Sequence, residues 1–340
     1  MTSTALLTVS NLSIRFHTDE GKVTAVEDLS YSLEPGQTLG IVGESGSGKS
    51  VSTKALMRLL PDNAEIDSTA RILYGTKQGN YVDIAQLPAR SKALNQIRGG
   101  EIAMIFQEPS AAFSPLYTIG NQMIEGIRLH RKVSRDQARK LAIEMLERVG
   151  MTNPELRIDQ YAFQLSGGMR QRAMIASALA MRPALLIADE PTTALDVTIQ
   201  AQILDLLAEL QREFGMAILF ISHDLAVISQ IATDVLVMYL GRAMEIGPVR
   251  TIIREPKHPY TQGLIKAIPR LDDLEAPLLP IPGDIPSPLE RPQGCVFHTR
   301  CPHSAENPRC QSNVPNATQT DPNHVAACHL LEEKVLEETV

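Results

Sequence analysis

The chain has 340 residues, of which 44% are hydrophobic and 21% are charged, and its formal net charge is -7. This is the composition of a globular protein with one large domain and a smaller one, and its acidic balance argues against a general electrostatic affinity for nucleic acid. No apolar run reaches the roughly 18 residues that a membrane span needs, and the first residues lack the basic segment of a signal peptide, so we expect a cytoplasmic chain without a span of its own.

The first motif along the chain is the glycine-rich segment Gly43-Glu-Ser-Gly-Ser-Gly-Lys-Ser50. An apolar run, Leu39 to Val42, predicts a buried strand before it, and the residues from Val51 to Leu60 predict a helix that Pro61 ends. A strand, a glycine-rich turn and a helix are the context of a P-loop. An ordinary glycine-rich turn is the weaker alternative.

In a P-loop the backbone N–H groups point at phosphate oxygens, and the N-terminus of the following helix favours an anion. The pattern predicts that Lys49 reaches the β- and γ-phosphates of a nucleotide and that the Ser50 hydroxyl ligates Mg²⁺. The other phosphate-binding positions are those of the loop itself, namely Gly43, Glu44, Ser45, Gly46, Ser47 and Gly48.

A second short apolar run, Ile102 to Phe106, is followed by Gln107. A glutamine at the end of a strand in a nucleotide site can contact Mg²⁺ and the attacking water, and so sense the γ-phosphate. Taken alone, Gln107 would be an ordinary surface amide. The segment that follows, from about 108 to 180, has mainly helical patterns and predicts an inserted helical subdomain. Within it, Ser134 and Gln137 form a capping box that opens a helix ending near Gly150.

The apolar run Leu185-Leu-Ile-Ala predicts a buried strand that ends in Asp189-Glu190. Beside a P-loop, Asp189 can hold Mg²⁺ directly or through water. Glu190 can act on the attacking water, either as a general base or as the group that orients it. Two carboxylates at a strand end are more often solvated and inactive, but the P-loop reverses that preference.

Asp196 predicts the N-cap of a helix with one apolar face, and Gly215 lies just beyond its expected end. Two further apolar runs, Ala217 to Ile221 and Val235 to Leu240, predict buried strands. His223 follows the first of them and can hydrogen-bond a γ-phosphate, although a lone histidine there is more often a polar loop residue. Strands that alternate with helices predict an α/β core.

The segment Leu165-Ser-Gly-Gly-Met169-Arg-Gln-Arg172 resembles the signature motif of ABC-type ATPases. The other motifs stand in that family's order, with a P-loop, a loop at Gln107, the signature, a Walker B strand ending at Asp189, a D-loop at Ala194-Leu195-Asp196 and a switch histidine at His223. The resemblance implies an α/β P-loop NTPase fold with an inserted helical subdomain. It also implies an ATPase that uses ATP and Mg²⁺, with Asp196 among the nucleotide-binding residues.

In that family the signature motif caps the γ-phosphate bound to a partner subunit, so that two ATPs are held between two subunits. The resemblance implies that Ser166, Gly167 and Gly168 serve the partner's nucleotide and that Phe16 stacks on adenine. Met169 departs from the family's usual glutamine. Because the implied contacts come from Ser166 and the backbone, we expect the signature to remain competent.

The resemblance narrows to the ATP-binding subunits of bacterial dipeptide and oligopeptide importers. The segments that carry it are Glu44-Ser45 inside the P-loop, Gln107-Glu-Pro-Ser-Ala-Ala-Phe-Ser-Pro115, Met169-Arg-Gln-Arg172, His258-Pro-Tyr-Thr-Gln-Gly-Leu264 and Gly294-Cys-Val-Phe-His-Thr-Arg-Cys-Pro302. This family implies a second ABC ATPase subunit, paired as a heterodimer, two membrane-spanning permease subunits and a periplasmic or extracellular solute-binding protein. It places the chain at the cytoplasmic face of the inner membrane and implies no nucleic-acid partner. Related importers take opines, glutathione or nickel, so the solute stays open.

The alternative function is that of a soluble ABC ATPase in DNA repair or translation. Repair proteins of this type carry long coiled coils between the P-loop and the signature, and the interval from Ser50 to Leu165 is too short for them. Ribosomal ones carry two cassettes in one chain, and this sequence has one. We therefore favour the importer.

The part of the chain after residue 270 is rich in proline. Its prolines predict an extended, irregular segment, because proline fixes φ and lacks an N–H; they are Pro277, Pro280, Pro282, Pro286, Pro288 and Pro292. We expect an ABC nucleotide-binding domain at 1–250, a proline-rich connector at 251–294 and a small Cys-rich C-terminal tail domain at 295–330.

All four cysteines fall in that tail, at Cys295, Cys301, Cys310 and Cys328. In a reducing cytosol such clustering favours a metal or cluster site over disulfides. Four thiolates can bind an iron–sulfur cluster or zinc. Similar tails in the peptide-importer family carry a [4Fe-4S] cluster, so the resemblance favours that group. Zinc with mixed ligands and a metal-free tail remain as alternatives, since four of the eight histidines lie nearby, at His298, His303, His324 and His329.

Overall fold

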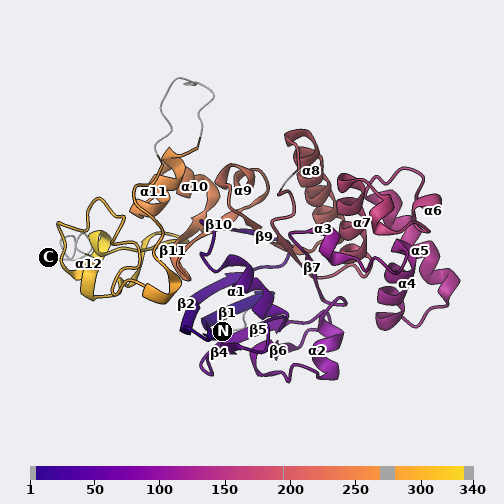
Figure 1. Ribbon diagram of the computed structural model, residues 1–340, viewed down its shortest axis with the longest axis horizontal. Helices are drawn as coiled ribbons and strands as arrows, with labels where there is room; N and C mark the ends of the chain where they lie inside the picture. Colours follow the sequence, from indigo (N-terminus) through magenta and orange to yellow (C-terminus); the bar gives the residue numbers. More distant parts are fainter. Residues whose placement is uncertain (1–4, 194, 269–279, 333–340) are drawn as a thin grey trace. The chain divides into compact units, whose positions relative to one another are not determined.

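The computed structural model of the chain describes residues 5–193, 195–268 and 280–332 (Figure 1). Ala194 and Pro277, which the sequence analysis names, lie outside them. The described residues form two compact units, each assembled from separate stretches of chain. The first unit takes the described parts of Met1–Leu6, Leu33–Gln37 and Tyr74–Ile221, and the second those of Leu7–Ser32, Thr38–Leu73 and Ser222–Val340.

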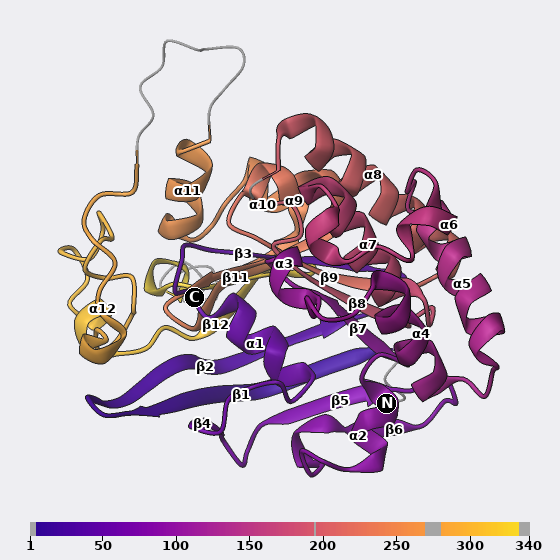
Figure 2. The ribbon, with the colours of Figure 1, turned by 45° about the vertical axis from the view of Figure 1, so that its right-hand side comes forward.

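A buried parallel sheet forms the centre of the first unit (Figure 2). Strand β8 (Leu185–Asp189) pairs in parallel with β7 (Ile102–Ile105) on one side and with β9 (Ala217–Ser222) on the other. Every residue of the three strands is buried. Continuous burial on both faces explains why these strands are unbroken apolar runs in the sequence, and it confirms the strands predicted there.

Helix α7 packs against β7 of this sheet, and α4, α5 and α7 pack on one another, with α3 against α7 and α6 against α5. Figures 1 and 2 both show α4 to α7 gathered together. The predicted helical segment therefore contains helices as expected. The elements of this unit other than the sheet are β6 (Tyr81–Asp83), η1 (Ile84–Gln86), α2 (Lys92–Ile97), α3 (Pro109–Ala112), α4 (Ile119–His130), α5 (Arg135–Arg148), α6 (Pro154–Arg157), η2 (Ala162–Gln164), α7 (Gly167–Leu179) and α8 (Val197–Phe214).

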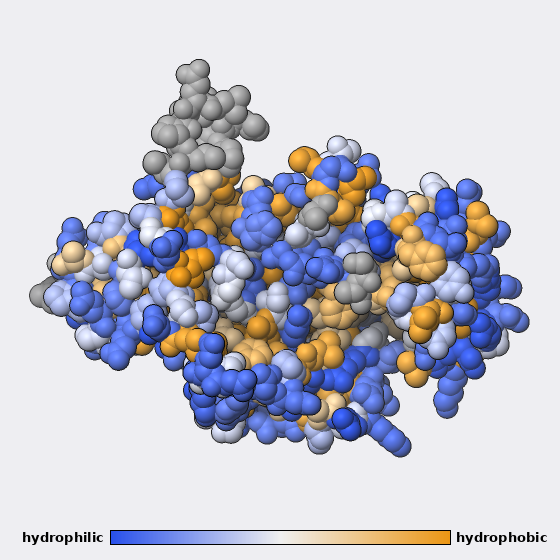
Figure 3. Space-filling view, in the orientation of Figure 1, coloured by the Kyte–Doolittle hydropathy of each residue, from blue (hydrophilic) through white to orange (hydrophobic). Residues whose placement is uncertain are grey.

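The predicted helix caps of this unit are present. Ser134 and Gln137 form both hydrogen bonds of the capping box at the start of α5. Asp196 caps α8, and Gly215 ends it with a φ of 65°, a left-handed conformation that glycine adopts without steric cost. On the face that Figure 3 shows, hydrophilic residues cover most of the α4 to α7 region and separate its hydrophobic patches. Among the described residues, no helix has the length and apolar character that crossing a bilayer requires.

The second unit contains two groups of strands. In the first group, β1 (Leu7–Thr18) lies between β2 (Gly21–Leu33) and β5 (Arg71–Gly75), and β4 (Ala64–Ile66) pairs with β1 antiparallel. In the second, β3 (Thr38–Val42) pairs in parallel with β10 (Asp234–Tyr239), followed by the antiparallel strands β11 (Arg242–Pro248), β13 (His324–Ala327) and β12 (Ala317–Asp321). Strands β3 and β10 were predicted, whereas the β12–β13 hairpin was not.

The helices of the second unit are α1 (Lys49–Leu56), α9 (Leu225–Ile231), α10 (Val249–Arg254), α11 (Pro259–Lys266), α12 (Arg309–Ser312) and the short turn η3 (Pro288–Glu290). The prediction that the first of these reaches Leu60 was wrong. Helix α1 ends at Leu56, because Arg58 takes a left-handed φ of 53° that breaks the helical path before Pro61. The described part of the proline-rich stretch, from residue 280, has only η3 before the first cysteine, as its irregular character predicted.

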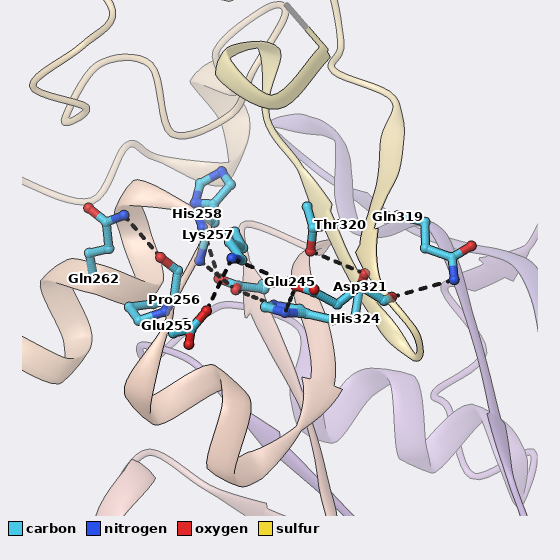
Figure 4. A network of polar contacts seen from close by, with 10 residues as sticks. All are labelled: Glu245, Glu255, Pro256, Lys257, His258, Gln262, Gln319, Thr320, Asp321 and His324. Carbon is cyan, nitrogen blue, oxygen red and sulfur yellow. Dashed lines mark hydrogen bonds and ion pairs between the residues drawn. The ribbon is translucent and has the colours of Figure 1, made fainter. Parts of the chain in front are cut away.

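A buried carboxylate joins three segments of the second unit (Figure 4). Glu245 of β11 accepts hydrogen bonds from the backbone N–H groups of Lys257 and His258, at 2.7 and 3.0 Å. Its Oε1 also lies 2.7 Å from Nε2 of His324 in β13, and both side chains are 0% exposed. A carboxylate taken fully out of water needs such partners to offset its lost hydration. Glu245 therefore docks both the C-terminal hairpin and the segment before α11 onto β11.

We expect His324→Ala to lower the free energy of unfolding by about 3 kcal/mol, because it leaves a buried carboxylate without its side-chain partner. Asp321→Asn is the matched control, since its carboxylate lies 3.7 Å from Nδ1 of the same histidine but is 50% exposed. That control should change the free energy by less than about 1 kcal/mol. Denaturant unfolding of both variants measures the difference, and equal losses would contradict the role given to Glu245.

Candidate nucleotide-binding site

The glycine-rich loop between β3 and α1 approaches other backbone so closely that two of its positions accept only glycine. A Cβ on Gly43 would lie 2.2 Å from the carbonyl oxygen of Met238. A Cβ on Gly48 would lie 2.4 Å from the carbonyl oxygen of Ala25, and Gly48 also has a left-handed φ of 92°. The absence of side chains at these two positions lets the loop curl tightly onto the start of α1.

Lys49 is the first residue of α1, and its side chain turns back into the loop. The ammonium nitrogen donates to the carbonyl oxygens of Gly43 and Glu44, at 2.7 and 3.0 Å, and to the hydroxyl of Ser47 at 3.3 Å. Lys49 is only 6% exposed. A buried positive charge at a helix N-terminus, enclosed by a curled backbone, is an arrangement suited to phosphate oxygens.

The other predicted residues of this unit lie at positions consistent with a nucleotide site. Ser45 and Gly46 are exposed, and Ser50 is half-buried in the first turn of α1. Phe16 is half-buried near the end of β1, opposite Ala64 of β4. His223 is exposed directly after β9, beside the Asp224 that caps α9.

In the first unit, the two predicted carboxylates lie at the C-terminal end of β8. Asp189 is 2% exposed. Glu190 has a φ of 47°, a left-handed conformation that is uncommon for a residue with a side chain and is often found at functional sites. Its backbone N–H donates to the carbonyl oxygen of Ile221, which ties the strained residue to β9.

Glu190 is held by two side chains of the same unit. Gln107 donates from Nε2 to Glu190 Oε2 at 3.1 Å, and the Thr193 hydroxyl donates to the same oxygen at 2.8 Å. The predicted glutamine and carboxylate therefore come together in the structure. Thr193 was not predicted, since a threonine four residues after the end of β8 gives no local signal.

The signature residues stand at the start of α7. Ser166 is the N-cap and its hydroxyl accepts a hydrogen bond from the Met169 N–H at 3.3 Å. A Cβ added to Gly167 would meet no atom within 4 Å, and one on Gly168 would lie 4.0 Å from Ile199. Gly167 is exposed and has open space around it within this unit, whereas Gly168 is half-buried. Met169 contributes its backbone N–H to the cap, which any residue at this position can supply.

A buried amide that the sequence analysis did not assign links α7 to the carboxylate loop. The Gln171 side chain is buried and donates to the carbonyl oxygen of Pro191, the residue after Glu190. Asp196, by contrast, is exposed and its carboxylate accepts from the Ile199 N–H at 2.9 Å as the cap of α8. The predicted residues thus form one group in each unit, the P-loop in the second and the Gln107–Glu190 pair in the first.

The four cysteines are free thiols, of which Cys295 and Cys328 are buried and the other two half-buried. Burial raises the pKa of Cys295 to about 11 and that of Cys328 to about 12, and it also raises the pKa of Cys301. The charges of the other three cysteines also raise the pKa of Cys328.

The predicted metal site is not confirmed. Within the described part of the chain, no group of three or more His, Cys, Asp or Glu side chains is arranged to hold a metal ion. Two of the histidines considered as zinc ligands are committed elsewhere, since His324 lies against Glu245 and both ring nitrogens of His329 have hydrogen-bond partners. Thiolates are suitable ligands for zinc or an iron–sulfur cluster, but the described cysteines are not arranged as a metal site.

Comparison with known families identifies the chain. Residues 26–193 match the family described as "ABC transporter", and residues 244–310 match "Oligopeptide/dipeptide transporter, C-terminal region". A putative peptide import ATP-binding protein of Brucella melitensis is 45% identical over 334 residues, covering 96% of this chain and 98% of that protein. The chain belongs to the ABC transporter family. The family resemblance carried by the motifs is thereby confirmed.

Other members of the ABC transporter family are similarly close. The oligopeptide transport ATP-binding protein OppD of Escherichia coli is 47% identical over 332 residues, covering 98% of this chain and 95% of OppD. The OppD of Salmonella typhimurium is 47% identical over 331 residues, covering 97% and 95%.

Solved structures of ABC proteins share the fold. The dimeric post-hydrolysis state of the ATP-binding cassette MJ0796, bound to ADP and phosphate, has a TM-score of 0.62 at 24% identity, covering 72% of this chain and 99% of that one. A subunit of the ABC transporter complex cbiONQ from Clostridium perfringens has a TM-score of 0.60 at 26% identity, covering 74% and 92%. The predicted ABC ATPase fold is confirmed by this likeness.

Two glycine substitutions separate backbone strain from steric clash in the P-loop. Gly46 and Gly48 both have a left-handed φ, but a Cβ on Gly46 meets no atom within 4 Å. We expect Gly46→Ala to lower the free energy of unfolding by about 1 kcal/mol through strain alone. Gly48→Ala should lower it by about 3 kcal/mol, because backbone atoms must move as well. Denaturant unfolding tests this order, which equal values would refute.

Proposed function

We propose that the chain is the ATP-hydrolysing subunit of a membrane ABC transporter that imports dipeptides and oligopeptides. The observation that carries this proposal is that one chain matches both the ABC transporter family and the oligopeptide/dipeptide transporter C-terminal region, in that order. Relatives of nearly the same length are named as peptide import or oligopeptide transport ATP-binding proteins. These names favour an importer over a soluble ABC ATPase of DNA repair or translation.

The P-loop group binds the triphosphate in this proposal. Lys49 neutralises the β- and γ-phosphates, the N–H groups of residues 43–48 surround them, and Phe16 stacks on adenine. The buried Lys49 ammonium and the two glycine contacts support this role. Ser50, Asp189 and Gln107 would hold Mg²⁺, which supplies charge neutralisation at the phosphates when bound.

The Gln107–Glu190 pair acts on the attacking water in this proposal. Glu190 orients the water or accepts its proton, and Gln107 and Thr193 fix the carboxylate by donating to one of its oxygens. His223 contacts the γ-phosphate. Holding the carboxylate in place before ATP arrives reduces the cost of ordering it during the reaction.

A second ATPase subunit completes the site in this proposal. Ser166, Gly167 and Gly168 at the start of α7, together with Asp196, serve the nucleotide of the partner. The open space at Gly167 and the position of these residues at the N-terminus of α7 support this role, because helix N-termini attract phosphate. We propose a heterodimer of two related ATPases, so that one chain supplies a P-loop face to one ATP and a signature face to the other.

The other proposed partners are the membrane and solute-binding proteins that an importer requires. We propose that the subunit lies at the cytoplasmic face of the inner membrane, beneath two permease subunits, and that a periplasmic or extracellular protein delivers the solute. The helical segment at about 108–180 and the Gln107 loop would pass the ATP-driven motion to the permease. We retain the boundaries of 1–250, 251–294 and 295–330 for the nucleotide-binding domain, connector and tail. Peptides are favoured over opines, glutathione or nickel as solutes by the names of the relatives.

For the C-terminal region we propose that Cys295, Cys301, Cys310 and Cys328 bind a [4Fe-4S] cluster, with zinc as the second candidate. The support is chemical, since all four cysteines of the chain lie between residues 295 and 328 and the other three raise the pKa of Cys328. The raised pKa values of Cys295, Cys301 and Cys328 favour the neutral thiols unless a cation stabilises the thiolates.

Glu190→Gln tests the hydrolytic role in the assembled transporter. The amide keeps the shape of the side chain but cannot accept a proton, so ATP turnover should fall by about 100-fold to 10⁴-fold while ATP binding persists and closed dimers accumulate. Thr193→Val is the control, because it removes only one hydrogen bond to the carboxylate and should lower turnover far less. Near-normal hydrolysis by the glutamine variant would exclude Glu190 from this role.

Anaerobic purification followed by iron, sulfide and zinc assays tests the cluster. We expect roughly four iron and four sulfide per chain in the wild type, and a large loss of both in Cys328→Ser. Stoichiometric zinc without sulfide would replace the cluster with a zinc site, and the absence of all three elements would leave the region metal-free.

A further inference from the structure

The Cys-rich C-terminal region, residues 295–330, contacts the P-loop through an ion pair. Arg300, which precedes Cys301, donates from Nη1 to Glu44 Oε2 at 2.6 Å and from Nη2 to Glu44 Oε1 at 3.2 Å. The two residues are 256 positions apart in the sequence and lie in the same unit. Two parallel N–H···O contacts to one carboxylate form the strongest and most directional type of side-chain pair.

The arginine is itself fixed at every nitrogen. Nε donates to the carbonyl oxygen of Pro282 at 3.1 Å, Nη2 also donates to that of Ile281 at 3.2 Å, and Nη1 lies 3.3 Å from the Tyr239 hydroxyl. The Arg300 side chain is only 4% exposed, against 25% for Glu44. Water therefore screens this pair less than a surface pair, and the guanidinium has little freedom to leave.

The backbone of Glu44 is held by a residue of helix α11. Its N–H donates to the hydroxyl of Tyr260 in α11 at 3.0 Å. The Tyr260 ring packs 4.8 Å from that of Tyr239 and 5.2 Å from that of Phe297, measured between centroids. Phe297 belongs to the Cys-rich region, so an aromatic cluster and an arginine from the C-terminal part both converge on one P-loop residue.

Glu44 stands where its orientation matters for phosphate binding. Its carbonyl oxygen and that of Gly43 accept hydrogen bonds from the Lys49 ammonium. A rotation of the peptide at Glu44 would therefore move both an N–H of the loop and an acceptor of the lysine. The Arg300 and Tyr260 contacts resist that rotation, while the next two residues of the loop, Ser45 and Gly46, are exposed.

We propose that Arg300 is a positioning residue for the P-loop, which makes the C-terminal region part of the nucleotide site. It acts through Glu44, and this inference rests on the proposed function of the loop in binding ATP. Affinity for the nucleotide then depends on how the C-terminal region is folded, although that region contributes no group to the phosphates. A ligand or chemical change that moved Arg300 would alter ATP binding at a distance.

The test is a double-mutant cycle on the full-length chain, read out by equilibrium binding of a fluorescent ATP analogue with Mg²⁺. Arg300→Gln and Glu44→Gln should each weaken binding by about tenfold, as expected for the loss of a charge-assisted pair. The double variant should be no weaker than the single ones, because both substitutions remove the same constraint. Arg300→Lys should fall between wild type and Arg300→Gln, since lysine keeps the charge but not the two parallel contacts.

Lys257→Ala is the matched control. Lys257 also ties the C-terminal hairpin to the rest of the unit, through Asp321 at 3.7 Å (Figure 4). Within the described residues its side chain pairs with Glu255 and Asp321, neither of which belongs to the P-loop. This variant should bind the analogue like the wild type. In the assembled transporter, Arg300→Gln should raise KM for ATP with a smaller change in kcat, which a loss of folding alone would not produce.

The outcomes separate this inference from the proposed function. If the wild type binds no ATP analogue, the proposed function fails. If the wild type binds and Arg300→Gln binds equally well, Arg300 has no positioning role. Additive losses in the double variant would also overturn the inference, because the two residues would then act independently. If Arg300→Gln does not fold, Glu44→Gln and Arg300→Lys still decide the result, since the first leaves the arginine in place and the second keeps its charge.

Discussion

The burial of the Lys49 ammonium is the constraint on which the nucleotide site depends. A cation removed from water needs oxygen atoms close by to offset its lost hydration. The carbonyl groups of Gly43 and Glu44 supply them, and they can do so only because the loop curls back over the start of α1. That curl in turn requires backbone contacts at Gly43 and Gly48 that no side chain would permit.

Few side chains have a proposed role in binding or hydrolysing ATP. Residues without such a role hold them in place. In the first unit, Thr193 fixes the Glu190 carboxylate, and Gln171 fixes the loop that follows it. In the second, Tyr260 and Arg300 fix Glu44. Rigid support of this kind lets a site present its polar groups already oriented, which reduces the entropy lost when a substrate binds.

Local signals made much of the fold predictable. Strands buried on both faces are continuous apolar runs, and the caps of α5 and α8 are made by residues next to the helices they begin. The P-loop and the Asp189–Glu190 pair were predictable for the same reason. The end of α1 was not, because a left-handed residue at Arg58 decides it. Arg300, Tyr260 and Gln171 lay in motifs that resembled the family, but their partners are distant in sequence, and only tertiary structure brings them together.

The pairing of β13 with β11 has a consequence for the autonomy of the C-terminal region. This strand covers the hydrogen-bonding edge of β11 and supplies the histidine that faces a buried carboxylate. A chain shortened before β13 would present an open strand edge to other molecules, and open edges promote association between chains. The pairing with β13 therefore removes part of an open strand edge, which lowers the tendency of the chains to associate through β11.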